Sequence, residues 1–191
     1  MSENYKESFE KTRKAGVIAA GALDEVSKII KPGISTHDID KICYEYIKDH
    51  GAFSAPLFYR GFPNSCCTST NHVVCHGIPS DKILKEGDII NVDVTALKDG
   101  WHGDTSRTFK IGDVSVKAKK LVKITYESMM KAIKIVKEDI HLGDIGAAIQ
   151  EHVEAEGFSV VQDFCGHGIG ESFHKEPNIL HYGKKETGEK I

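Results

Sequence analysis

The chain has 191 residues, a length that favours one or two domains over several. Hydrophobic residues make up 40% and charged residues 28%, ordinary values that exclude a disordered or fibrous protein. With 25 basic and 28 acidic side chains, the net charge of −3 gives no basic surface of the kind that nucleic-acid-binding proteins need. We therefore expect a folded protein without direct nucleic-acid contact.

The sequence also argues against a membrane protein and against a protein stabilised by disulfide bonds. No apolar run is long enough to cross a bilayer, and Met1–Lys6 lacks the apolar core of a signal peptide. We expect a cytoplasmic protein, with an organelle as the alternative. The five cysteines form no C-x-x-C pair, which argues against a disulfide framework and a thiolate zinc site. They are Cys43, Cys66, Cys67, Cys75 and Cys165.

The first part of the chain predicts two amphipathic helices. Apolar residues recur at helical spacing from Ala15 to Ile30 and stop at Pro32 and Gly33. A second helix follows, capped by Ser35 or Thr36 and ending at Gly51. Its expected buried stripe is Ile39, Ile42, Cys43, Tyr46 and Ile47.

The rest of the chain predicts loops, a hairpin and further helices. Residues 52–80 predict a loop, because glycine and proline interrupt short apolar runs. Alternation over Gly87–Phe109 predicts a β-hairpin that turns at Asp99-Gly100. Three further elements are expected after it, namely helices over 116–136 and 144–153 and a short strand at Phe158–Val161.

An internal repeat relates the two halves at an offset of 106 residues. The matched pairs are Ile34 and Ile140, Asp38 and Asp144, Ile39 and Ile145, Glu45 and Glu151, Ile47 and Val153, and Gly51 and Gly157. We predict a single α/β domain over 1–191, with pseudo-symmetric halves at about 5–113 and 114–191 that combine helices with antiparallel strands. The same offset carries the hairpin past Ile191, so the second half is expected to be incomplete.

The predicted hairpin carries two acidic side chains that invite a chemical explanation. Asp93 lies within an apolar strand, where aspartate is rare. If Asp99-Gly100 is a two-residue loop, Thr95 faces Asp104, and Asp93 lies diagonally from Asp104 on the same face. Like charges at this spacing repel unless a cation lies between them. A solvent-facing strand with an incidental acidic pair is the alternative, and a shift of one residue in register would separate the carboxylates.

Histidines favour a metal site. His167 lies in a run with three glycines, His174 follows seven residues later, and His76 precedes Gly77. An imidazole with two carboxylates suits manganese, iron, cobalt or zinc, and paired metals can activate a water for hydrolysis. A cysteine nucleophile, Cys165 or Cys75 beside a histidine, is the covalent alternative.

The chain resembles type I methionine aminopeptidases from about residue 5 to its end. The motifs that carry the resemblance are Val73-Val74-Cys75-His76-Gly77-Ile78-Pro79, Asn91-Val92-Asp93-Val94-Thr95, Asp99-Gly100-Trp101-His102-Gly103-Asp104-Thr105-Ser106, and Cys165-Gly166-His167-Gly168-Ile169-Gly170 through Phe173-His174-Lys175-Glu176-Pro177. This family has the "pita-bread" fold, a pseudo-twofold pair of α/β halves. The resemblance therefore implies the same two-halved fold that the repeat predicts.

The resemblance also implies a site with two divalent metal ions. Asp93 and Asp104 would bind metal, with Asp104 bridging, and His167 would bind one ion. His76 and His174 would contact the substrate, and His174 would help stabilise the oxyanion that develops at the first peptide bond. The residues implied around the methionine side chain are Tyr59, Phe62, Cys67 and Phe173.

The implied activity is removal of the initiator methionine from nascent polypeptides near the ribosome, by a protein that is monomeric when full length. Members of the family supply two glutamate metal ligands from strands of the second half. The chain ends before these strands, so we expect a truncated and inactive form. Glu176 and Glu186 do not occupy the matching motif. The alternatives are a proline-directed aminopeptidase of the same fold and a non-catalytic binding protein of that fold.

Overall fold

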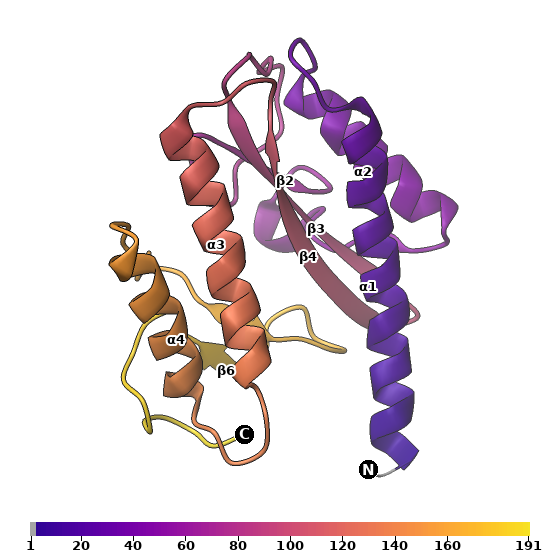
Figure 1. Cartoon of the computed structure of the whole chain (residues 1–191). Helices are drawn as coiled ribbons and strands as arrows, with labels where there is room; N and C mark the ends of the chain where they lie inside the picture. The colour runs from indigo at the N-terminus through magenta and orange to yellow at the C-terminus, as the bar shows by residue number, and fades with distance from the viewer. Residues whose placement is uncertain (1–2) are drawn as a thin grey trace. The chain divides into compact units, whose positions relative to one another are not determined.

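The computed structural model of the chain describes residues 3–191, so Met1 and Ser2 lie outside the described residues. Contacts divide the chain into two compact units. The first runs up to Ser115 and includes Ile169–Phe173, and the second comprises Val116–Gly168 and His174–Ile191. In chain order the elements are α1 (Glu3–Ile29), α2 (Thr36–Asp49), β1 (Phe53–Ser54), the 3-10 turn η1 (Tyr59–Gly61), β2 (Cys67–Thr70), β3 (Ile89–Lys98), β4 (Trp101–Lys110), α3 (Val116–Ile135), α4 (Leu142–Ala155), β5 (Gly166–Gly168) and β6 (Lys175–Ile179) (Figure 1).

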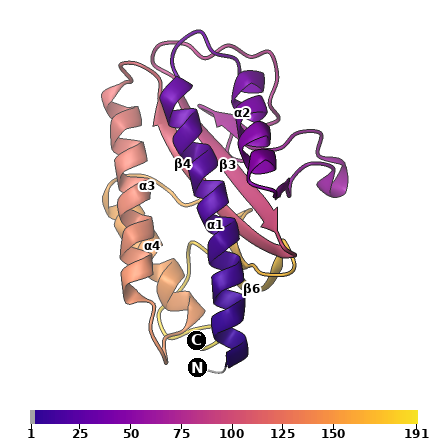
Figure 2. The same ribbon diagram turned by 90° about the vertical axis from the view of Figure 1, so that its right-hand side faces the viewer.

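The first unit is built on a four-stranded antiparallel sheet with β3 at its centre. β4 pairs with β3 along its whole length, and β1 and β2 pair with β3 as well. Helix α1 runs along β3 and β4 and also packs against α2 (Figure 2). Its approach to β4 is close, because a Cβ atom added at Gly103 would lie 2.1 Å from the backbone nitrogen of Gly16. The core between helices and sheet includes Leu23, Ile39 and Val92.

The hairpin register agrees with the prediction from sequence. Lys98 pairs with Trp101 and Thr95 pairs with Asp104, as a two-residue loop requires. Both loop residues have positive φ, +50° at Asp99 and +81° at Gly100, which is the conformation that such a tight turn needs. The predicted helices are also confirmed, including Ser35 as the N-cap of α2.

Two expectations about strands are wrong. Residues 52–80 contain strand β2, whose polar sequence Cys-Thr-Ser-Thr is buried at every position and so lacks the alternation of a half-exposed strand. Phe158–Val161 is not a strand. The backbone N–H of Phe158 instead donates to Val153 O at 3.1 Å, a bond that closes the C-terminal end of α4.

The second unit pairs α3 with α4, and α4 also contacts β6 (Figure 1). Strands β5 and β6 form a two-stranded antiparallel sheet with an irregularity between His167 and Gly168. Gly168 is needed there, because an added Cβ atom would lie 2.3 Å from the carbonyl oxygen of Glu176. Within residues 3–191, no helix is both long enough and apolar enough to span a membrane.

The starts of α2 and α4 repeat the same contacts. The Ser35 N–H donates to Asp38 Oδ2 at 3.0 Å, and the His141 N–H donates to Asp144 Oδ2 at 2.8 Å. Each aspartate therefore satisfies a backbone donor just before its helix, as capping residues do.

The flanking segments repeat as well. The Leu84 N–H donates to Ile34 O at 2.9 Å, and the Ile191 N–H donates to Ile140 O at 2.9 Å. Past the helices, φ is +63° at Gly51 and +81° at Gly157, the left-handed conformation that favours glycine. These shared contacts confirm the repeat at the level of individual hydrogen bonds.

Candidate active site

Asp93 and Asp104 lie on one face of the first unit's sheet. Asp104 pairs with Thr95 and Asp93 pairs with Ser106, so the two carboxylates are diagonal neighbours. Burial, the charge of Asp104 and a hydrogen bond with it raise the pKa of Asp93 to about 7. Ionising both carboxylates is therefore costly without a cation. This donor pair fits a divalent metal ion, which binds carboxylate oxygens and offsets their repulsion.

Cys67 lies directly across from Asp93 on the neighbouring strand β2. The side chain is 8% exposed, and burial, followed by the charges of Asp93 and Asp104, raises the pKa of its thiol to about 12. The pKa of Cys75 is also raised, first by burial and then by Asp93. A thiol with a raised pKa is a poor nucleophile, so this environment disfavours Cys75 as the covalent catalyst considered above.

The loop that carries His76 is held against β2. The Thr68 N–H donates to Gly77 O at 2.7 Å, and the Gly77 N–H donates to Ser69 Oγ at 3.1 Å. A Cβ atom added at Gly77 would lie 2.2 Å from Thr68 O, so a larger residue cannot approach the strand this closely. His76 itself has φ of +54° and an exposed side chain. The glycine contacts thus hold the backbone that carries His76 against β2.

Tyr59 and Phe62 lie in and just after the η1 turn. The Phe62 N–H donates to Tyr59 O at 2.9 Å, and the Phe58 N–H donates to Phe62 O at 2.8 Å, which closes the turn on itself. The ring centroid of Tyr59 lies 5.0 Å from that of Phe173. The first unit therefore brings together two of the four residues expected around a methionine side chain.

A carboxylate on α2 organises the segment between this turn and β2. Asp40 Oδ2 accepts from the Asn64 amide at 2.9 Å, and Oδ1 accepts from the Ser65 and Cys66 backbone N–H groups at 2.8 and 3.1 Å. The Ser65 hydroxyl lies 2.6 Å from the same Oδ1. Asp40 thus fixes the chain directly before Cys67.

The second unit supplies two histidines that lie close to each other. The ring centroids of His167 and His174 are 4.3 Å apart at an angle of 51°. His167 Nδ1 lies 2.9 Å from Gly168 O, and since a carbonyl oxygen only accepts, Nδ1 carries the proton in this contact. Nε2 is then the nitrogen whose lone pair suits a metal.

The expected site residues are distributed over both units. Asp93 and Asp104 belong to the first, as do the residues expected around the methionine, whereas His167 and His174 belong to the second. Among residues 3–191, no three or more His, Cys, Asp or Glu side chains converge as a metal site would require. Neither His102 nor Asp40 was predicted from the sequence to belong to the site. Strand alternation offered a signal for His102, because it stands two residues before Asp104 and so shares its face.

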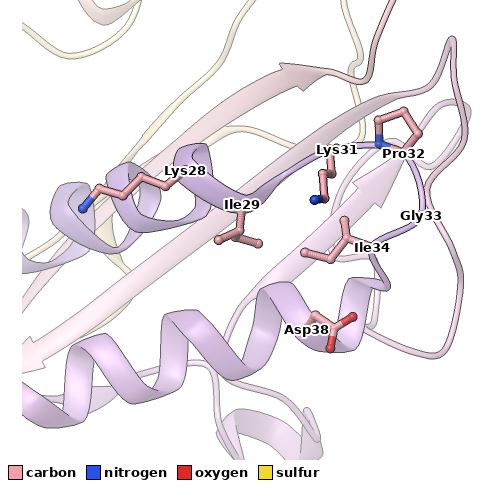
Figure 3. Close-up of a pocket in the computed structure, with 7 residues that line it drawn as sticks. All are labelled: Lys28, Ile29, Lys31, Pro32, Gly33, Ile34 and Asp38. Atoms are coloured by element: carbon pink, nitrogen blue, oxygen red, sulfur yellow. The ribbon is translucent and has the colours of Figure 1, made fainter.

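A separate hollow on the first unit contains none of these residues (Figure 3). It lies between the end of α1 and the start of α2 and is lined by Lys28, Ile29, Lys31, Gly33, Ile34 and Asp38. Two of its charged groups already have partners, since Lys28 Nζ lies 2.6 Å from Glu25 and Asp38 accepts from Ser35. The hollow therefore does not compete as the candidate active site.

Comparison with known proteins shows that the chain is a metallopeptidase. The sequence profile of metallopeptidase family M24 matches residues 10–190, and the chain belongs to this family. Membership implies divalent metal as a cofactor.

Individual proteins of this family show which of its members the chain is similar to. The chain is 54% identical over 189 residues to the methionine aminopeptidase of Escherichia coli (strain K12), covering 98% of this chain and 72% of that protein. The crystal structure of methionine aminopeptidase from Rickettsia prowazekii matches with a TM-score of 0.96 and 51% identity, covering 97% of this chain and 75% of that one. Prolidase from Pyrococcus furiosus matches with a TM-score of 0.81 but only 23% identity, covering 95% and 53%, and shows the fold alone. The predicted pita-bread fold and family are confirmed.

Proposed function

We propose that the protein hydrolyses the first peptide bond of polypeptides that begin with methionine and continue with a small residue. The observation that carries the proposal is in the first unit. There the Asp93 and Asp104 pair lies beside Cys67, and the Tyr59 and Phe173 rings lie together. A methionine thioether favours such soft, aromatic surroundings. Close identity to methionine aminopeptidases supports the same substrate.

In this proposal Asp93, Asp104 and His167 would hold two divalent ions, and Asp104 would be the ligand that both ions share. The raised pKa of Asp93, caused by burial and by Asp104, supports a cation at the pair. Cobalt, manganese, iron or zinc suits one imidazole with carboxylates. When bound, such ions activate water and polarise the peptide carbonyl.

The remaining residues bind and orient the substrate. Tyr59, Phe62, Cys67 and Phe173 surround the methionine side chain, so that only a free N-terminal methionine places its peptide bond at the carboxylates. His76 contacts the substrate from its loop against β2, and its imidazole can donate a hydrogen bond to the peptide. His174 donates to the carbonyl oxygen as negative charge develops there.

The physiological substrates in this proposal are nascent polypeptides, which the enzyme binds in the cytoplasm near the ribosome. The enzyme is a monomer, and its two halves form one aminopeptidase domain. A net charge of −3 supports contact with polypeptide ends rather than with RNA directly.

Product analysis tests this function. Full-length protein, purified and supplied with a divalent metal, should release methionine from Met-Ala-Ser and spare Ala-Pro-Ser, and a chelator should stop the reaction. Mass spectrometry identifies the products. Cleavage of the Ala-Pro bond with Met-Ala-Ser left intact would instead assign a proline-directed peptidase.

A further inference from the structure

Residues 169–173 form a short loop of the first unit that is anchored on β4 through His102. The His102 backbone N–H donates to Gly170 O at 2.8 Å, and ring Nδ1 lies 2.9 Å from the same oxygen. Because the carbonyl only accepts, Nδ1 carries a proton in this contact and both groups donate to one oxygen. The Gly170 N–H in turn donates to Ser172 O at 3.2 Å. The beginning of the loop is thus fixed twice by one residue.

The same imidazole also supports the end of the loop. Its ring stacks on Phe173 with centroids 5.5 Å apart and an angle of 10° between the planes. Phe173 meets Tyr59 at 5.0 Å and 57°. Contacts between ring pairs of this kind add to the stability gained from their buried area. Phe173 therefore contacts two aromatic rings, one from the η1 turn and one from β4.

His102 also shares a strand face with the acidic pair. It pairs with Leu97, while Asp104 pairs with Thr95, so the two β4 side chains project from the same side of the sheet. The His102 side chain is 9% exposed, which leaves its ring little freedom to turn away from Gly170. One strand thus carries a carboxylate of the candidate active site and the anchor of the loop that bears Phe173.

We propose that His102 is the positioning residue that fixes the loop 169–173 and, through Phe173, one wall of the methionine pocket. The inference rests on the proposed function, because it assigns a residue that determines selectivity for the methionine side chain. His102 itself need not touch the substrate. Without the imidazole, the loop loses the hydrogen bond from Nδ1 to Gly170 O, and Phe173 loses its stacking contact with β4.

Three variants separate the two contacts of the imidazole. His102→Ala removes both the Nδ1 donor and the ring, His102→Asn keeps a donor near the position of Nδ1, and His102→Phe keeps a ring without the donor. His50→Ala is a matched control, because His50 Nδ1 lies 2.8 Å from Tyr46 O and its ring stacks on Tyr46 at 4.1 Å, away from this loop.

Two measurements are made on each variant. Hydrogen exchange read by mass spectrometry reports the order of residues 169–173, and a titration with L-methionine followed by NMR reports the pocket. We expect His102→Ala to speed exchange of the loop and weaken L-methionine binding, each by about tenfold. His102→Asn and His102→Phe should fall between it and the unaltered protein. Peptides from α2 should exchange unchanged in all three His102 variants, and His50→Ala should leave the loop and the binding unchanged.

The outcomes distinguish this inference from the function on which it rests. Unchanged loop exchange in His102→Ala would overturn the anchoring role. Faster exchange with undiminished L-methionine binding would overturn the role in the pocket, while the proposed function would stand. If the unaltered protein does not bind L-methionine, the methionine pocket itself is refuted, and the assignment of His102 to that pocket falls with it. If instead His50→Ala loosens the loop equally, the effect is not specific to His102 and the inference is wrong.

Discussion

Helices α2 and α4 begin and end with the same hydrogen bonds, but they differ in how deeply they are buried. In α2, Ile39, Cys43 and Ile47 are all 0% exposed, because the helix packs with α1 over the four-stranded sheet. In α4, Ile145 is 7% and Val153 is 9% exposed, and the helix packs on α3 and β6. The repeated segments therefore share local structure without sharing a core.

The two helices show that local sequence determines where a helix begins and ends, whereas packing on the sheet determines how deeply it is buried. An aspartate three residues after the N-cap and a glycine after the helix define both helices. The chemistry is not repeated in the same way. The first unit carries the acidic hairpin, whereas the second carries His167 and His174.

The largest expected effect concerns one histidine from each unit. His76→Ala and His174→Ala should each lower kcat of the full-length enzyme for Met-Ala-Ser by about 10²–10³, because the proposed function assigns each imidazole as a donor to the reacting peptide. Metal content, measured by elemental analysis, should stay close to that of the unaltered protein. His72→Ala, an exposed histidine near His76 in sequence, is the control and should change neither quantity. Loss of metal in both site variants would show that they are ligands instead.

Core truncations should show the difference in burial between the helices. Ile47→Ala should lower the free energy of unfolding by about 3 kcal/mol, since it leaves a cavity in a fully buried site. Val153→Ala removes fewer atoms from a less buried site and should cost about 1.5 kcal/mol. Urea denaturation measures both. Val116→Ala, at a side chain that is 83% exposed, is the control and should have little effect. Equal losses at the two helices would contradict the comparison.

The smallest effect should be shared by the two helix starts. Hydrogen bonds from the Ser35 hydroxyl and backbone N–H lower the pKa of Asp38, and the Glu186 and His141 backbone N–H groups lower the pKa of Asp144. Folding therefore favours the ionised form of each carboxyl, so its contribution is present above the ordinary value of 3.8 and is lost as pH falls through the folded value.

Acid unfolding of matched variants tests this sign. Stability of Asp38→Asn and of Asp144→Asn, followed by circular dichroism from pH 5 down to about pH 2, should fall less steeply than that of the unaltered protein. A steeper fall in either variant would mean that its carboxyl is not stabilised in the charged form.

The hairpin and the helix ends could be predicted because their signals are local. Asp99-Gly100 fixed the register and hence the diagonal of Asp93 and Asp104, and Asp38 and Asp144 marked the helix starts. Strand β2 could not be found by alternation, because all four of its residues are buried. Strands β5 and β6 were also missed. Their pairing depends on the absence of a side chain at Gly168, a long-range contact that no local pattern reveals.

The candidate site was predictable only in part, for a related reason. The sequence pattern placed two carboxylates together, but the contacts of His102 with Gly170 join residues far apart in the chain. The hydrogen bonds that Asp40 accepts from Asn64, Ser65 and Cys66 likewise link α2 to a segment that the sequence predicts to be a loop. Such contacts follow from tertiary packing rather than from spacing.

The most direct test of the central claim is a calorimetric titration of the purified full-length protein with Mn²⁺, beside two variants of the same hairpin. Asp104→Asn keeps the side-chain shape but removes the charge, and Asp99→Asn makes the same change in the turn, where φ of +50° suits asparagine equally. The account predicts that the unaltered protein and Asp99→Asn bind Mn²⁺ alike, whereas Asp104→Asn binds at least about a hundredfold more weakly. Equal affinity in Asp104→Asn and the unaltered protein would contradict the assignment of the acidic pair as the metal site.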